Sequence, residues 1–209
     1  MPESRLRKIY KNFNLTIKKS FEWIQVINDL SNIRDSKIKK EHIYFAYELA
    51  FIKIFTGWER FLQDSFISYM TGSSIVQYKP KLYLKRIRKD HALKILSGTE
   101  DYPDWSKIEE VYTLAQLYFV DGEPFMLALQ QIETYFNDMK KIRNAIVHIS
   151  SKSEEKYQGL VRARMSSYHP AISPGEFLRL PCRKGGTVTF LEFYVSYLET
   201  ASNKIILGN

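Results

Sequence analysis

The segment 143–148 brings together three side chains whose chemistry is complementary. Arg143 carries a permanent positive charge, Asn144 a small amide and His148 an imidazole. An imidazole can accept or release a proton near neutral pH, and a guanidinium holds a phosphate with a planar fork of donors. These groups suit the cleavage of a phosphodiester without a metal ion. Arg143, His148 and Asn144 are therefore the candidate catalytic residues.

The same spacing of arginine and histidine occurs at two other places, so spacing alone does not select a site. Arg164 lies five residues before His169, but His169 precedes a proline, which disfavours a helical conformation. Arg86 lies five residues before a histidine in the basic run 84–90. This run is either a solvated surface or a patch that holds phosphates. Its candidate RNA-binding residues are Lys85, Arg86, Arg88 and Lys89.

Arg143 differs because it belongs to a segment with a clear helical pattern. The core-facing stripe of a helix over residues 124–150 is predicted from the spacing of Met139, Ile142, Ile146 and Ile149. Asn144 and His148 are one turn apart and lie away from the centre of this stripe. Arg143 lies at the edge of the stripe, and its long side chain must curl to reach them.

The rest of the chain is also dominated by helical patterns. Gly and Pro number only 9 and 7, and long stretches without them favour helices. Apolar spacing predicts helices over residues 6–33, 37–70 and 124–150. Shorter helices are expected over residues 83–96, 106–119, 154–165 and 191–205. A small β-hairpin is expected near residues 177–190, with strands at 177–180 and 187–190. The fold class is therefore all-α, in one domain of residues 1–209.

Charge and composition narrow the partners. The chain has 209 residues and a net charge of +8, which favours polyanions, with nucleic acid the first candidate. Lys140 and Lys141 add positive charge beside Arg143 and are further candidates for binding RNA. The single Cys182 excludes an intramolecular disulfide. No signal peptide or apolar run long enough to span a membrane is found, so we expect a cytoplasmic protein.

Two segments together resemble the HEPN superfamily. Residues 143–148 resemble its Arg-x(4–6)-His signature, with a polar residue directly after the arginine. Residues 47–66, which contain Trp58-Glu59, resemble the long second helix of its RiboL-PSP branch of bacterial defence-associated proteins. The resemblance implies an all-α bundle of about four to six helices that pairs into a homodimer. It also implies a metal-independent endoribonuclease without a cofactor, often a toxin or a phage-defence effector.

The resemblance assigns roles to individual residues. Arg143 and His148 correspond to the catalytic pair, and Asn144 to their polar neighbour. Glu59 and Glu48 are both candidates for the supporting acidic residue on the second helix. The implied partners are RNA, a second copy of the chain and an antitoxin or another defence-system protein. No cluster with metal-ligand spacing is present in the sequence, so no metal site is expected.

Two other functions remain open from the sequence. One is a non-catalytic HEPN-like module that binds RNA or a nucleotide through the basic surfaces around residues 85–89 and 140–143. The other is a helical scaffold for protein interactions, which the aromatic-rich helices would support equally well. The chemistry of product ends separates the enzyme from both, because neither alternative cleaves RNA.

Overall fold

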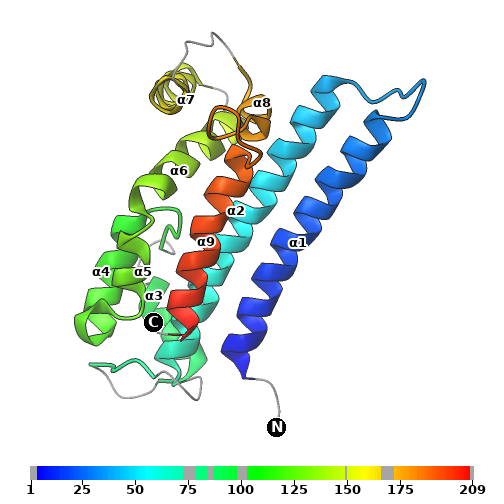
Figure 1. Ribbon diagram of the computed structural model, residues 1–209. Coiled ribbons are helices and arrows are strands. Elements are labelled where there is room, and N and C mark those ends of the chain that lie inside the picture. The colour runs from blue at the N-terminus through cyan, green and yellow to red at the C-terminus, as the bar shows by residue number, and fades with distance from the viewer. Residues whose placement is uncertain are drawn as a thin grey trace. The chain divides into compact units, whose positions relative to one another are not determined.

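The computed structural model is α-helical, as the sequence predicts, and describes residues 4–72, 79–83, 87–97, 103–148, 150–165 and 172–207. Within these ranges there are nine α-helices, one 3-10 turn and no β-strand (Figure 1). The elements are α1 (Arg5–Ser31), α2 (Lys40–Met70), α3 (Lys89–Ser97), α4 (Ile108–Tyr118), η1 (Val120–Gly122), α5 (Phe125–Gln130), α6 (Glu133–Val147), α7 (Ser151–Arg164), α8 (Pro174–Arg179) and α9 (Phe190–Leu207).

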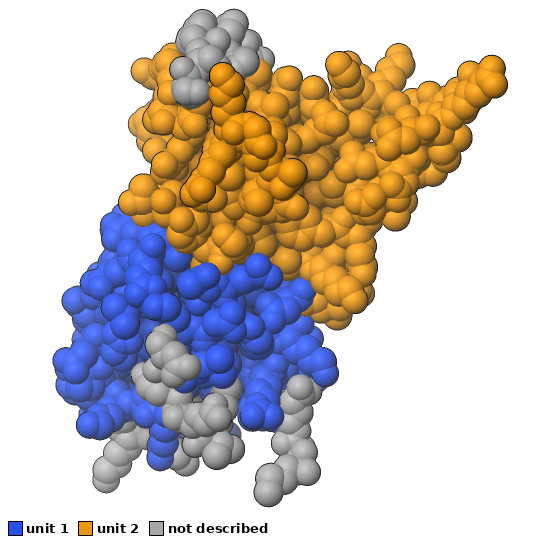
Figure 2. Space-filling view, viewed as in Figure 1, with its two compact units in different colours: residues 1–14, 57–133, 198–209 blue, residues 15–56, 134–197 orange. Residues whose placement is uncertain are grey.

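The contacts within the chain define two compact units, which Figure 2 colours separately. Unit 1 consists of residues 1–14, 57–133 and 198–209, and unit 2 of residues 15–56 and 134–197. The helices α1, α2 and α9 each contribute residues to both units. The segment 143–148 lies in unit 2, so this unit positions the candidate site.

The two long helices bury the side chains that their apolar spacing indicates. Phe13, Ile17 and Ile24 of α1 are buried, and so are Phe51 and Ile54 of α2. A helix turns once every 3.6 residues, so these positions fall on one side of each helix. The predicted end of α2 at residue 70 is confirmed, and Gly72 just beyond it adopts a positive φ of 82° that glycine tolerates best.

Aromatic rings make up much of the core in unit 1. The ring of Phe13 lies 5.7 Å from that of Trp58 and 5.3 Å from that of Phe61. A second group centres on Phe66, whose ring lies 4.9 Å from those of Phe119 and Phe125. Rings of this size bury large apolar areas and prefer offset or edge-to-face contacts at these separations.

The core of unit 2 fixes the helix that carries the candidate site. Phe136 of α6 stacks on Phe55 of α2, with 5.5 Å between ring centroids. The preceding residue, Tyr135, stacks its ring on that of Tyr197 of α9, with 4.0 Å between ring centroids. Because these two contacts attach α6 to α2 and α9, they constrain the position and the rotation of α6.

The predicted helix over residues 124–150 is wrong in its extent. The structure divides it into α5, which ends at Gln130, and α6, which begins at Glu133. A tight turn separates them, in which the N–H of Ile132 donates to the carbonyl of Leu129 at 3.1 Å. Ile132 is buried, so apolar packing holds this turn. The sequence contains no glycine or proline there to reveal it.

The predicted strand at residues 177–180 is a helix instead. Ser173 accepts a hydrogen bond from the N–H of Glu176 and caps α8, and Pro174 occupies its first turn. Both residues favour the start of a helix. Beyond α8 the chain reverses through one isolated antiparallel bridge between Pro181 and Thr189. A single bridge is no hairpin of two strands, so the predicted hairpin is not observed.

Two further differences from the predictions concern the start of α3 and the number of helices. The helix predicted over residues 83–96 begins only at Lys89, as α3. Tyr83 instead donates its N–H to the carbonyl of Tyr118 at 3.2 Å, beside a bridge between Leu82 and Phe119. The nine described helices also exceed the expected four to six, because breaks at short turns divide the pattern further. No described helix has both the length and the apolar character to span a membrane.

Candidate active site

The candidate catalytic residues lie at the C-terminal end of α6. The last helical residue is Val147, and the N–H of His148 still donates to the carbonyl of Asn144 at 2.8 Å. The next helix, α7, follows closely and is capped by Ser150, whose side chain accepts from the N–H of Ser153. His148 therefore lies in a short connection that is held at both ends by helices.

The structure brings Arg143, Asn144 and His148 into direct contact. Nη1 of Arg143 lies 3.1 Å from Oδ1 of Asn144 and 2.7 Å from Nε2 of His148. A guanidinium remains protonated in proteins and only donates, so Nε2 of His148 is the acceptor. The ring is then neutral, with its proton on Nδ1. The arginine side chain curls toward the other two residues as the sequence predicts.

The surroundings of the three residues are partly apolar and open to solvent. Arg143 and Asn144 are half-buried, His148 is exposed, and Val147 is 47% exposed. The predicted core stripe is confirmed at its first two positions, because Met139 and Ile142 are buried. Further along, Ile146 is only half-buried, and Ile149 lies outside the described residues.

The guanidinium of Arg143 contacts the amide of Asn144 and the imidazole of His148. Within the described ranges it makes no ion pair with a carboxylate, and its two hydrogen-bond partners are an amide and an imidazole. Arg164 shows the contrasting case, because its Nη2 lies 2.6 Å from Oδ2 of Asp138. The positive charge of Arg143 thus remains available to an anion, whereas that of Arg164 is already balanced.

The two lysines beside the site have different surroundings. Nζ of Lys141 lies 3.3 Å from Oδ1 of Asp138, so part of its charge is balanced by the same carboxylate that holds Arg164. Lys140 is half-buried and makes no ion pair in the part of the chain that the structure describes. Lys140 is therefore the better of the two candidates for contacting RNA.

Glu48 makes a different contact from the one expected of a supporting acid. Its Oε1 accepts the backbone N–H of Gly175 at 2.9 Å, so it joins α2 to the first turn of α8. Burial raises the pKa of Glu48, and the hydrogen bond from Gly175 opposes this rise. Glu59 is half-buried in α2 and belongs to unit 1. Its supporting role stays a prediction.

The basic run 84–90 lies partly outside the described residues, which exclude Lys85 and Arg86. Arg88 is strongly exposed and pairs with Asp90, with 3.4 Å between Nε and Oδ1. Lys89 is exposed at the start of α3. Both belong to unit 1. Solvent screening makes such a surface ion pair weak, so both cations stay accessible to phosphates.

Sequence reasoning missed several polar residues of unit 2. Asp138 is buried at 4% exposure, and it holds Arg164 and Lys141, yet a single aspartate in an amphipathic helix gives no distinct signal. Glu176 and Arg179 were also missed, because the predicted strand covered only residues 177–180 and strand geometry places residues three apart on opposite faces. Recognising Ser173-Pro174 as a helix start would have placed them three residues apart on one helical face.

No group of three or more His, Cys, Asp or Glu side chains within the described ranges has an arrangement that could hold a metal ion. Comparison with known proteins gives no further indication: the chain matches no family model, no curated protein and no solved structure.

Proposed function

We propose that the protein is a metal-independent endoribonuclease whose catalytic residues are Arg143 and His148. The observation that carries the proposal is the 2.7 Å contact between Nη1 of Arg143 and Nε2 of His148. It places a proton-transfer group next to a cation that has no carboxylate partner among the described residues. The resemblance of residues 143–148 and 47–66 to HEPN nucleases supports the same reaction.

The reaction uses the 2′-hydroxyl of RNA as the nucleophile. A phosphate is a stronger acceptor for a guanidinium than a neutral ring nitrogen, so the scissile phosphate draws Arg143 away and frees Nε2 of His148. Nε2 takes the proton of the 2′-hydroxyl while the 2′-oxygen forms a bond to phosphorus. The bond from phosphorus to the 5′-oxygen then breaks, and an acid protonates that oxygen. Arg143 stabilises the charge that builds on the non-bridging oxygens.

A homodimer supplies both proton-transfer groups. The reaction needs a base and an acid, while each chain brings one His148 to the site. Two copies of residues 143–148 at one cleft would provide two imidazoles and two guanidinium groups. The exposed Val147 offers an apolar contact beside His148 for the second copy. Asn144 keeps the guanidinium oriented through its 3.1 Å hydrogen bond.

Positive charge around the site favours RNA over neutral ligands. Lys140 adds a cation without an ion-pair partner in the described ranges, and α7 begins three residues after His148, so the positive end of its dipole lies near the site. The biological role that we propose is a toxin or a phage-defence effector, with an antitoxin or another defence protein as its partner.

The test is cleavage of a labelled RNA in the presence of a chelator. The parent should yield 2′,3′-cyclic phosphate and 5′-hydroxyl ends, and His148→Ala should lower the rate by about 100-fold or more. His91→Ala is the matched control, because His91 is exposed and also lies five residues after an arginine. Arg143→Lys should also lower the rate, since an ammonium group cannot reproduce the planar fork.

Other outcomes identify the alternatives. If the His148→Ala and His91→Ala variants cleave equally well, His148 is not catalytic and the proposal fails. If the parent binds RNA without cleaving it, the protein is a binding module. A substrate with 2′-O-methyl groups throughout must resist cleavage by the parent, because it lacks the nucleophile.

A further inference from the structure

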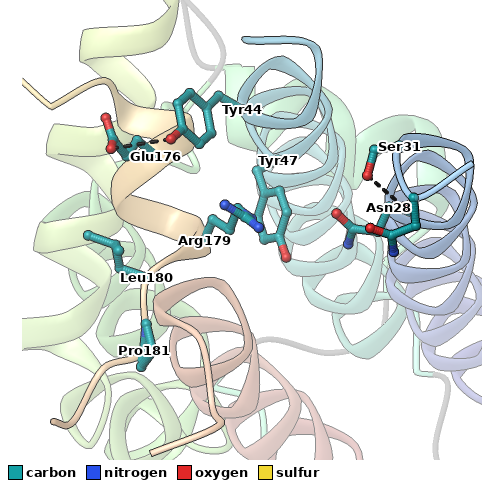
Figure 3. A pocket seen from close by; sticks show the side chains of 9 residues that line it. Asn28, Ser31, Tyr44, Tyr47, Glu176, Arg179, Leu180 and Pro181 are labelled. Atoms are coloured by element: carbon teal, nitrogen blue, oxygen red, sulfur yellow. Dashed lines mark hydrogen bonds between the residues drawn. The ribbon is translucent and has the colours of Figure 1, made fainter. Parts of the chain in front are cut away.

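A polar pocket of about 460 Å³ lies in unit 2, apart from the residues of the candidate active site. Its walls come from the C-terminal end of α1, the first turns of α2 and the end of α8 (Figure 3). The residues that line it are Asn28, Ser31, Asn32, Tyr44, Tyr47, Glu176, Arg179, Leu180 and Pro181. This volume falls within the range of roughly 300–1,000 Å³ that is typical of sites for small molecules.

A close approach of two helices forms the wall between α2 and α8. A Cβ atom at Gly175 would lie 2.1 Å from the carbonyl oxygen of Tyr44, so only glycine fits there. The same residue donates its N–H to Glu48 at 2.9 Å. These contacts fix the first turn of α8 against α2. Glu176 and Arg179, three residues apart on α8, then face Tyr44 and Tyr47 across the pocket.

Two tyrosines give the pocket aromatic walls and hydroxyl donors. The hydroxyl of Tyr44 donates to Oε1 of Glu176 at 3.3 Å. Burial raises the pKa of Tyr44, and the charge of Glu176 raises it further. Burial also raises the pKa of Tyr47, against the opposing effects of Asn28 and Arg179. Both phenols therefore stay protonated and neutral at physiological pH.

Arg179 supplies the positive charge of the pocket. It is exposed and makes no hydrogen bond or ion pair with any described residue. Figure 3 shows its guanidinium beside the Tyr47 ring. A guanidinium in this position can hold a carboxylate or a phosphate through two parallel hydrogen bonds. The amides of Asn28 and Asn32 add donors and acceptors on the opposite wall.

We propose that this pocket binds a nucleoside monophosphate unit, with its phosphate on Arg179. A ligand that satisfies the lining needs an anionic group for Arg179 and a planar group for the tyrosine rings. It also needs hydroxyl or amino donors for Glu176. A nucleotide carries all three, whereas inorganic phosphate lacks the planar group and a nucleoside lacks the anionic group. The unit is either a free mononucleotide or an unpaired nucleotide of an RNA strand.

Isothermal titration calorimetry on the full chain tests the proposal. The probes are AMP, GMP, CMP and UMP, with adenosine and inorganic phosphate for comparison, and a 2′-O-methyl RNA oligonucleotide that cannot be cleaved. Arg179→Gln should weaken binding on the order of tenfold or more, because a charge-assisted hydrogen bond is lost. Arg183→Gln is the matched control. Arg183 is exposed, lies close to Arg179 in the sequence and does not line the pocket.

The outcomes separate the two sources of the nucleotide. Tighter binding of a mononucleotide than of adenosine or phosphate, dependent on Arg179 but not Arg183, identifies a free nucleotide. The same dependence with the oligonucleotide alone identifies a nucleotide within a strand. The proposal is overturned if no probe binds or if Arg179→Gln binds as the parent does. If nucleotide binding depends on Arg179 but the protein cleaves no RNA, only the proposed nuclease activity is contradicted. The nucleotide pocket is then still supported.

Discussion

Replacing Asp138 by alanine removes the carboxylate that connects α6 to α7. Oδ2 of Asp138 lies 2.6 Å from Nη2 and 2.7 Å from Nε of Arg164, and Oδ1 lies 3.3 Å from Nζ of Lys141. The guanidinium also lies over the ring of Tyr135, with 5.1 Å to its centroid. This cluster holds the helix that carries Arg143 and ends just before His148, so its loss should lower the stability of unit 2.

The expected loss of unfolding free energy follows from burial. Removing one partner of a buried ion pair costs about 3–5 kcal/mol, because the other charge is left uncompensated. The side chain of Asp138 is 6% exposed, but that of Arg164 is 29% exposed, so water rehydrates part of the guanidinium. We therefore expect about 3 kcal/mol, at the lower end of that range. Consistently, burial tends to lower the pKa of Arg164, but the hydrogen bond and charge of Asp138 outweigh this effect and raise it.

The assay is urea denaturation followed by far-ultraviolet circular dichroism. Asn137→Ala is the matched control, since Asn137 is a half-buried neighbour on the same helix. The double variant Asp138→Ala/Arg164→Ala should cost less than the sum of the two single variants, because the pair is lost only once. The reasoning is refuted if Asp138→Ala is no more destabilising than Asn137→Ala, or if the two single changes are additive.

The remaining predictions concern the contact between α2 and α8. Gly175→Ala should lower the unfolding free energy by about 1–3 kcal/mol, because its methyl group would overlap the backbone of Tyr44. Gly159→Ala is its control with the opposite sign: nothing lies within 4 Å of the added methyl, so a gain of about 0.5–1 kcal/mol is expected in the middle of α7. Equal effects in urea denaturation would contradict the close packing. For Glu48, burial raises the pKa above its ordinary 4.5, so the folded chain binds the proton more tightly than the unfolded chain does. The ionised carboxylate thus weakens the fold at neutral pH, and the penalty disappears as the pH falls through the folded pKa toward 4.5. Glu48→Gln should therefore unfold at a higher urea concentration than the parent at pH 7, with little difference at pH 4. A difference that is the same at both pH values would refute burial of the ionised carboxylate as the cause.

Apolar spacing predicted the long helices and failed at short interruptions. Phe51 and Ile54 belong to an apolar pattern in α2 that repeats with the helical period, so their burial follows from the sequence alone. The break between α5 and α6 is one tight turn at Ile132, which is itself buried. An apolar residue inside a turn continues the periodic pattern, so periodicity cannot locate such a break. The short helix α8 was misassigned because six residues contain fewer than two turns of the period.

The local part of the candidate site was predictable, whereas contacts across the chain were not. Asn144 and His148 are separated by one helical turn, so their proximity follows from helix geometry. Glu48, one of two candidates for the supporting acidic residue, accepts a hydrogen bond from Gly175, 127 residues away. A contact of this kind depends on how α8 packs against α2, and no local pattern encodes that packing. The same reason hid the pocket, whose walls come from three separate segments.

Arg143 and Arg164 each precede a histidine by five residues, but their contacts in the structure differ. Arg164 has the same distance in sequence to a histidine as Arg143, but α7 ends at Arg164 and a buried aspartate neutralises its charge. Arg143 contacts an amide and an imidazole, both neutral, and keeps its charge for an anion. An arginine that already holds a carboxylate must break that pair before it can bind a phosphate, and breaking a buried pair costs several kcal/mol. Arg143 has no such pair in the described ranges, so phosphate binding there competes with its hydrogen bonds to the amide of Asn144 and the imidazole of His148.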